Sequence, residues 1–328
     1  MALIDRVRRG LLCSTLLPLA TAQGQVLRAA TMTTTDFAQL DRAKTAVILP
    51  GGILEEHGPY LPSYSDGFLN EHLADSLAAA IVARPGWKAV VFPPIPLGNS
   101  AANDIGGSFS FAGTYAVRFE TLRAVFMDLG DELGAQGFRW IFVVHLHGGP
   151  NHSRALDDAG DYFRATYGGR MVHLAGLLRV IGALEGKKAP ASKRADGLPM
   201  HAGMDETSLL TFLTPSLVRP GFRTAPDQAD SSMEGLIRLA KAPQWPGYFG
   251  APRLATPEHG ARIWRALTDS TTRVALRILD GAEPNRMIRF ATVMAGSRPD
   301  ERLDAASRAA EQKRAVRQNA WLRARRRP

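Results

Sequence analysis

The sequence TAVILPGGILEEHGPYLPSYSD, residues 45–66, is the stretch on which the prediction of the fold rests. Its first part, residues 45–49, is a short apolar run rich in Val and Ile, and a Pro-Gly-Gly turn closes it. This pattern predicts a buried strand that ends in a turn. Glu55 and His57 lie two residues apart, so in extended backbone their side chains leave on one face, away from Glu56. The end of this strand is therefore a candidate site for chemistry.

Asp66 is the next carboxylate after His57, beyond Gly-Pro and Leu-Pro pairs that stiffen the connecting loop. Carboxylates and imidazoles are ligands of divalent metals, and one carboxylate can bridge two ions through its two oxygens. Glu55, His57 and Asp66 can therefore begin a dinuclear metal site. The alternative is an ordinary surface loop that happens to read Glu-Glu-His. The sequence downstream bears on the choice between the two.

Apolar periodicity beyond this stretch alternates between strand and helix patterns. Asp66 is expected just before a helix N-terminus, where backbone amides stabilise a carboxylate. Helices are predicted at 67–82, 118–137, 153–167 and 261–279, strands at 87–96, 138–144 and 170–174, and loops at 97–114 and 215–257. Such alternation implies right-handed crossovers and a largely parallel sheet, which makes the chain an α/β protein.

Two further clusters of polar residues follow predicted elements. His-Leu-His-Gly-Gly-Pro-Asn-His, residues 145–152, comes directly after a strand, at the edge where parallel sheets bind ligands. His201 and Glu206 lie five residues apart at the boundary between a loop and a helix, so both can face one cavity. His145 and His152 suit supporting or surface roles better than ligation.

Three motifs in the same order resemble those of the creatininase family. They are E-x-H-G-P-x-L-P-x-x-x-D at 55–66, H-G-G-x-N at 147–151 (with Pro150 as an extra residue in the turn) and H-A-G-x-x-E-T-S at 201–208. This family includes creatinine amidohydrolase, formamide deformylases and a mycofactocin-precursor peptidase. The resemblance, which covers roughly residues 40–285, implies a Rossmann-like three-layer sandwich with a mostly parallel sheet, assembly into a homohexamer, and hydrolysis of a C–N bond with two divalent metals per chain.

The resemblance also implies a ligand set. Glu55, Asp66 and His147 would hold one metal, while His57 and a bridging Asp66 would hold the second. In creatininase the second metal takes a further glutamate, at the position that Gly149 occupies here. Glu206 is then the candidate to complete that site as a ligand or to support it from outside. Zinc, manganese and iron all suit carboxylate and imidazole ligands.

These positions predict a divalent-metal-dependent amidohydrolase that acts on a small amide, formamide or cyclic amide. A metal-activated water would be the nucleophile, His201 would donate a proton to the departing nitrogen, and Glu206 is a second candidate catalytic residue. The alternative role for His201 is to order its loop. The alternative for the whole chain is a metal-containing protein that binds a small ligand without turnover.

Several positions depart from creatininase itself. Gly148 replaces a tyrosine of the substrate pocket, Glu56 stands where glutamine is usual, and the tryptophans that flank the substrate have no counterpart beside Met200. These changes alter the shape and charge of the pocket but leave the expected ligands in place. The substrate is therefore expected not to be creatinine.

The two ends of the chain differ from the middle. Residues 1–22 have the form of a signal peptide: arginines precede an apolar run, and Ala-Thr-Ala forms a cleavage site. Export to the periplasm or the medium is expected, with an ordinary first helix and a cytoplasmic protein as the alternative. Cleavage would remove Cys13, the single cysteine. The hydrolase domain would then span residues 23–296.

Residues 297–328 form a basic tail that carries about six of the nine net positive charges, ten basic residues against four acidic ones. It is rich in Ala and prone to form a helix, but it lacks a continuous apolar stripe. A solvated, fraying helix is the expectation. Contact with nucleic acid or an anionic surface is a weaker alternative, because Trp321 is the sole aromatic residue there.

Overall fold

A five-stranded parallel sheet forms the centre of the computed structural model, which describes residues 25–177, 180, 195–295 and 298–325. The strand order is β1-β3-β2-β4-β5. The largely parallel sheet predicted from the sequence is thus confirmed. The strands are β1 (Gln25–Arg28), β2 (Thr45–Pro50), β3 (Lys88–Val91), β4 (Trp140–Val144) and β5 (Arg170–His173).

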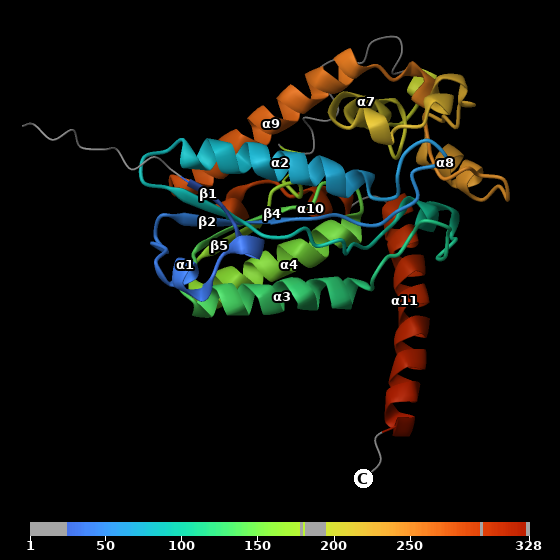
Figure 1. Cartoon of the computed structure of the whole chain (residues 1–328). Helices are drawn as coiled ribbons and strands as arrows, with labels where there is room; N and C mark the ends of the chain where they lie inside the picture. Colours follow the sequence, from blue (N-terminus) through green and yellow to red (C-terminus); the bar gives the residue numbers. More distant parts are fainter. Residues whose placement is uncertain (1–24, 178–179, 181–194, 296–297, 326–328) are drawn as a thin grey trace, which may run out of the picture.

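Helices cover both faces of the sheet and make a three-layer sandwich (Figure 1). Helices α2 and α9 lie on one face, and α3 and α4 lie on the other. The described helices are α1 (Thr34–Ala38), α2 (Ser65–Val82), α3 (Phe119–Ala135), α4 (Pro150–Tyr167), α7 (Met204–Leu213), α8 (Met233–Ala240), α9 (Pro257–Leu279), α10 (Phe290–Met294) and α11 (Arg298–Arg325).

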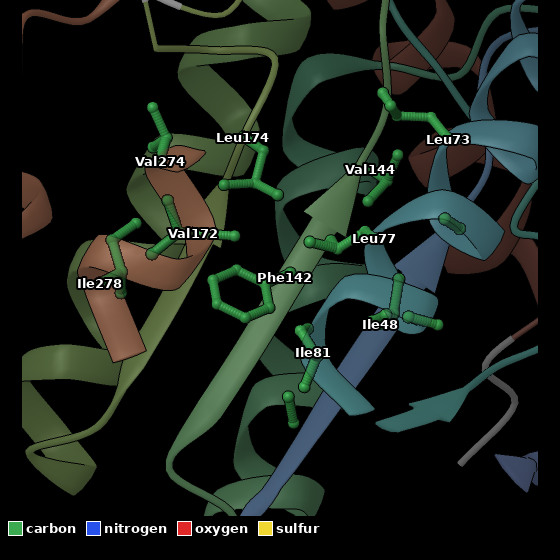
Figure 2. Packing of buried hydrophobic residues seen from close by; sticks show 14 of the residues in the cluster. Ile48, Leu73, Leu77, Ile81, Phe142, Val144, Val172, Leu174, Val274 and Ile278 are labelled. Atoms are coloured by element: carbon green, nitrogen blue, oxygen red, sulfur yellow. The ribbon is translucent and has the colours of Figure 1, made fainter. Parts of the chain in front are cut away.

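The sheet is buried on both faces because its strands are apolar at nearly every position. Ile48, Phe142 and Val172 point from adjacent strands towards α2 and α9, as Figure 2 shows. Their neighbours along the strands, such as Val47 and Ile141, pack against α3 and α4. Side chains alternate between faces with period two, so a continuous apolar run buries both. The two cores fix the strand ends from which the candidate site projects.

The predicted helices and strands are found, with differences at their ends. Helix α2 begins at Ser65, so Asp66 lies inside its first turn and not before it. Helix α4 begins at Pro150. The first residue of a helix has no intrahelical partner for its amide, so a proline, which lacks an N–H, is favoured there. His152 is therefore the third residue of the helix. The prediction of a loop over 215–257 is wrong for α8, whose N-cap Ser232 accepts a hydrogen bond from Gly235. Strand β1 was not predicted, because a four-residue edge strand has too short a pattern.

The ends of the chain give two further outcomes. The predicted signal peptide, residues 1–22, lies outside the described residues. The tail forms helix α11, but Ser307 and Glu311 are buried against the rest of the protein, so the expectation of a fully solvated helix is wrong there. Among the described helices, none is both long and apolar enough to cross a lipid bilayer.

Candidate metal centre

The candidate site lies where β2 and β4, adjacent in the sheet, end side by side. The chain runs from β2 to β3 on one side and reaches β4 on the other, so this is the point at which the strand order reverses. Ligand sites of parallel sheets form at such points. Asn70 of α2 joins the two strand ends: its Nδ2 donates to Gly51 O (2.6 Å), and Leu146 N donates to its Oδ1 (2.7 Å).

One group of candidate ligands combines Glu55, Asp66 and His147, which are all buried. His147 Nδ1 lies 3.0 Å from Asp66 Oδ2 and 3.3 Å from Glu55 Oε2. One potential ligand atom of each residue lies within 4.8 Å of those of the other two. Loops after two strands and the first turn of α2 therefore bring three potential donors together.

Two further groups combine His57 with Asp66 and Glu206, and His57 with Glu55 and His201. His57 Nε2 lies 3.4 Å from Asp66 Oδ1 and 3.7 Å from Glu206 Oε2. Asp66 thus presents Oδ2 to one histidine and Oδ1 to the other, which is the arrangement of a bridging carboxylate. Glu206 is the most exposed of the set, with 32% of its side chain accessible, and its Oε2 also accepts a hydrogen bond from Ala202 N (2.6 Å).

Backbone carbonyls orient both histidine rings. His147 Nε2 lies 3.1 Å from Asn99 O and 3.0 Å from Ser100 O, and His57 Nδ1 lies 3.1 Å from Glu55 O. A carbonyl oxygen can only accept, so these ring nitrogens carry the proton. The opposite nitrogens, Nδ1 of His147 and Nε2 of His57, then face the carboxylates with a free lone pair in the neutral ring. This is the tautomer that a ligand histidine requires.

The electrostatics of the cluster couple its carboxylates to its histidines. Burial lowers the pKa of both His57 and His147, but hydrogen bonds and charges of Asp66 and Glu55 outweigh it and raise each pKa to about 10. Burial raises the pKa of Glu55 to about 8 and also raises that of Glu206. Burial opposes ionisation of Asp66 too, yet the hydrogen bond from His147 and the charge of the neighbouring His57 keep its pKa low.

The donor set fits divalent cations. Glu55 Oε2 and His57 Nε2 are buried and have no hydrogen-bond partner in the part of the chain that the structure describes. Unpaired buried polar atoms are costly, and two of them in one cluster of acids and imidazoles indicate an absent cation. Carboxylates and imidazoles without a thiolate suit zinc, manganese or iron.

His201 lies against His57 and Glu55, with which it forms one of the candidate donor groups. Its ring centroid is 4.3 Å from that of His57, and its Nδ1 is 3.9 Å from Glu55 Oε1. Its Nε2 donates a hydrogen bond to Glu56 O, so Nδ1 carries the lone pair in the neutral ring. Burial lowers the pKa of His201 well below its ordinary value. His201 is therefore neutral here and presents a proton acceptor to the cluster.

Backbone strain concentrates around the same cluster. Ser100 (φ 61°) and Ala202 (φ 52°) are the two non-glycine residues with positive φ in the described ranges. Ser100 supplies a carbonyl to His147, and Ala202 supplies an amide to Glu206. Left-handed backbone costs energy for residues with a Cβ and is often retained at functional sites.

Two glycines of the 147–151 motif have different surroundings. A Cβ on Gly149 would lie 2.7 Å from Ser100 Cβ and 2.8 Å from His147 Nε2, so this loop excludes a glutamate at that position. A Cβ on Gly148 would meet nothing within 4 Å, and Gly148 is exposed. The position of the creatininase tyrosine is therefore open space here. Glu56 points elsewhere and accepts a hydrogen bond from Thr114, with burial raising its pKa to about 7.

Three further histidines form a buried group behind His147. The His152 ring centroid lies 5.0 Å from that of His147, 5.6 Å from that of His145 and 6.0 Å from that of His173. Burial lowers the pKa of His145 to about 3 and that of His173 to about 4. His145 and His152 belong to none of the candidate donor groups in the described residues, and both are fully buried, so the surface role is wrong for them.

Several residues that hold the site in place were missed from the sequence. Asn70 and Asn99 fix backbone at the strand ends, and Asp196 accepts hydrogen bonds from Met204 N and Ala251 N behind the His201 loop. A single Asn or Asp has no periodic signal. The one available indication was the Asn-Ser pair in a Gly-rich segment, which is typical of a turn.

A parallel α/β sheet with three overlapping groups of carboxylate and histidine donors at its carboxyl edge defines an α/β enzyme with a candidate metal centre. The family model described as "Creatininase: Creatinine amidohydrolase" matches residues 30–275. The chain therefore belongs to the creatininase family of hydrolases, which confirms the family predicted from the three motifs.

Known proteins of two kinds are similar to the chain. A mycofactocin precursor peptide peptidase of Mycobacterium ulcerans is 29% identical over 252 residues, which cover 74% of this chain and 89% of the relative. A crystal structure of creatinine amidohydrolase superposes with a TM-score of 0.59 at 21% identity, covering 78% of this chain and 99% of the other. A putative creatinine amidohydrolase from Bacteroides fragilis gives 0.57 at 22% identity, with 78% and 97% covered.

Proposed function

We propose that the chain is a divalent-metal-dependent amidohydrolase that cleaves the C–N bond of a small amide, formamide or cyclic amide. The observation that carries the proposal is Asp66, whose two oxygens face two histidines in two overlapping donor groups. Glu55 and His147 would hold one ion with Asp66, and His57 would hold the second with Asp66. Solved creatininases described as Mn and Zn–Zn forms support zinc or manganese over iron.

The residues around these ions would transfer the proton and complete the ligand set. Divalent ions supply Lewis acidity, which makes water a nucleophile near neutral pH and polarises a carbonyl. His201, neutral and with Nδ1 towards the cluster, would accept a proton there and return it to the departing nitrogen. Glu206 would complete the second ligand set, while its bond to Ala202 N also orders the His201 loop. Support of that loop alone is the other role open to Glu206.

The substrate can be larger than creatinine. The open space at Gly148 lies next to His147, where a bulky side chain would narrow the approach. The name of the similar mycofactocin precursor peptide peptidase describes an enzyme that acts on a peptide. A short peptide amide is therefore the second candidate substrate, beside formamides and cyclic amides.

Metal content tests the proposal directly. Protein purified without chelator is expected to carry two divalent ions per chain, and Asp66→Ala is expected to lose both. Asp75→Ala is the matched control, because Asp75 is a half-exposed residue of the same helix and pairs with Arg28. One ion or none in the wild type, unchanged by Asp66→Ala, would overturn the dinuclear site.

Turnover separates an enzyme from a binding protein. The metal-loaded protein is expected to hydrolyse at least one member of a panel of formamides, lactams and short peptide amides, and Asp66→Ala is expected to hydrolyse none. Two bound ions with no turnover across the panel would favour the alternative of a non-catalytic, metal-containing binding protein.

Assembly and location remain predictions. A homohexamer is expected from the family resemblance, and light scattering of the purified protein measures it. Export is expected from the signal-peptide pattern of residues 1–22. Mass spectrometry of the N-terminus in periplasmic and cytoplasmic fractions tests that prediction.

A further inference from the structure

Helix α11 lies outside the part of the chain that matches the family, residues 30–275, yet it contacts the segment that supports the metal centre. Its first half runs beside the loop that contains the 3-10 helix η2 (Ala102–Gly106), and its second half extends away from the sandwich (Figure 1). Ser307 Oγ donates to Asp104 Oδ2 (3.0 Å), and Arg314 Nη1 donates to Ala116 O (3.2 Å). The helix is therefore attached by specific polar contacts.

Glu311 is the acidic residue at the centre of this attachment, and only 7% of it is exposed. Its two carboxylate oxygens accept from Phe119 N, each over 3.1 Å. Phe119 is the first residue of α3, and its N-cap, Arg118, makes no side-chain capping bond. A carboxylate at a helix N-terminus pairs with an unsatisfied amide and with the helix dipole. Glu311 thus caps α3 from 192 residues away.

The same carboxylate also holds Asn99. Asn99 Nδ2 donates to Glu311 Oε1 (2.5 Å) and to Val117 O (2.7 Å), so both of its amide hydrogens are used. Asn99 N donates to His152 Nδ1 (3.3 Å). These bonds fix the side chain and the backbone of Asn99 together.

The backbone that Glu311 fixes in this way orients His147. The carbonyls of Asn99 and Ser100 both accept from His147 Nε2, and this places Nδ1 towards Asp66 and Glu55. Ser100 has a strained, left-handed backbone, so its position depends on such neighbours. A continuous series of hydrogen bonds thus runs from Glu311 through Asn99 to the candidate ligand.

We propose that Glu311 is a positioning residue of the metal centre: by fixing Asn99, the C-terminal helix sets the orientation of His147 and so the affinity of the ion that His147 holds. This inference rests on the proposed function, because it requires that His147 binds a metal. It assigns the extension a role in the site, in addition to any role of its projecting half.

The test is a chelator competition on the Zn²⁺-loaded, full-length protein. Removing a partner that orients a ligand histidine costs about 10–100-fold in metal affinity, and Glu311 acts one step further away. Glu311→Ala is therefore expected to weaken one of the two ions by about tenfold and to leave the other within about twofold. Glu311→Gln retains an oxygen acceptor for Asn99 and is expected to restore most of the affinity. Replacing Zn²⁺ by Co²⁺ should give an altered visible spectrum in Glu311→Ala alone.

Two controls separate positioning from attachment of the helix. Ser307→Ala removes the bond to Asp104 without touching Asn99, so it is expected to lower the melting temperature but not the metal affinity. Glu301→Ala changes an exposed residue of the same helix and is expected to change neither. Asn99→Ala combined with Glu311→Ala should weaken the ion no more than Asn99→Ala alone, because both act through one contact.

The outcomes are distinct. Two tightly bound ions in both the wild type and Glu311→Ala would overturn the role of Glu311 and leave the proposed function standing. Equal losses of affinity in Ser307→Ala and Glu311→Ala would overturn it too, since any loosening of the helix would then suffice. A wild-type protein that binds no divalent ion would overturn the proposed function itself.

Discussion

Two groups of buried histidines lie side by side in this protein and behave in opposite ways. His57 and His147 have pKa values raised to about 10, whereas His145 and His173 have values lowered to about 3 and 4. All four are buried. The difference is the presence of Asp66 and Glu55, which face the first pair. Burial alone expels charge from an imidazole, and a neighbouring carboxylate reverses that effect.

The comparison separates a site that binds cations from a packed core of the same residue type. The first pair faces carboxylates and so belongs to a donor set that fits cations. The second pair is neutral, with His173 Nε2 donating to His145 O (2.8 Å). We therefore expect the largest effects for substitutions of the carboxylates and the smallest for substitutions of the neutral histidines.

After Asp66→Ala, Glu55→Gln should have the largest effect, because it makes the surroundings of His147 more like those of His145. Glu55 belongs to two of the candidate donor groups. We expect kcat/KM on the best substrate to fall by about a thousandfold, since Lewis-acid catalysis is worth several kcal/mol. Steady-state kinetics with measured metal content tests this. Activity within tenfold of the wild type, with both ions bound, would contradict the assignment of Glu55.

His201→Gln should lower kcat by about a hundredfold or more, the usual contribution of a positioned acid–base group. Both ions should remain bound, because His201 is expected to act on the proton and not on the metal. The pH dependence of kcat should lose the ionisation that belongs to His201. His72→Gln, on the outer part of α2, is the control. Loss of an ion in His201→Gln would instead make His201 a ligand.

Glu206→Gln decides between ligation and support. As a ligand beside His57, Glu206 is expected to contribute more to the affinity of one ion than the roughly 10–100-fold of a residue that only orients a ligand. The ion held by Glu55 and His147 should be unaffected. Chelator competition measures the affinity of each of the two ions. A change of less than about tenfold in both would assign Glu206 the single role of holding Ala202 N.

His173→Gln tests the neutral group through stability. The pKa of His173 is 6.5 in an ordinary environment and about 4 here. As the pH falls, the unfolded chain therefore takes up a proton on His173 at a higher pH than the folded protein does. Its contribution to stability is complete above pH 6.5 and is lost as the pH falls towards 4, by about 1.4 kcal/mol per pH unit. Urea unfolding of the metal-free protein should therefore weaken more steeply below pH 6.5 in the wild type than in His173→Gln. Parallel pH dependences would show that His173 is not held neutral.

The elements of the sandwich could be predicted because each leaves a periodic signal. The apolar run of β2 and the helical stripe of α3 are visible without knowledge of their partners. The candidate ligands were inferred from the family motifs, and the structure brings these residues together. Helix α8 was missed because Pro and Gly in its surroundings concealed a segment of only eight residues.

The sequence by itself determined the parallel α/β architecture, the loops that carry the site, and the residue types at 55, 57, 66, 147, 201 and 206. Tertiary structure alone decided which oxygen of Asp66 faces which histidine, and that Asn70, Asn99 and Glu311 hold the surrounding backbone. The physical reason is the range of these interactions. Periodic burial is a local property of the chain, whereas a hydrogen bond across 212 residues, such as that between Asn99 and Glu311, exists only once the elements have packed.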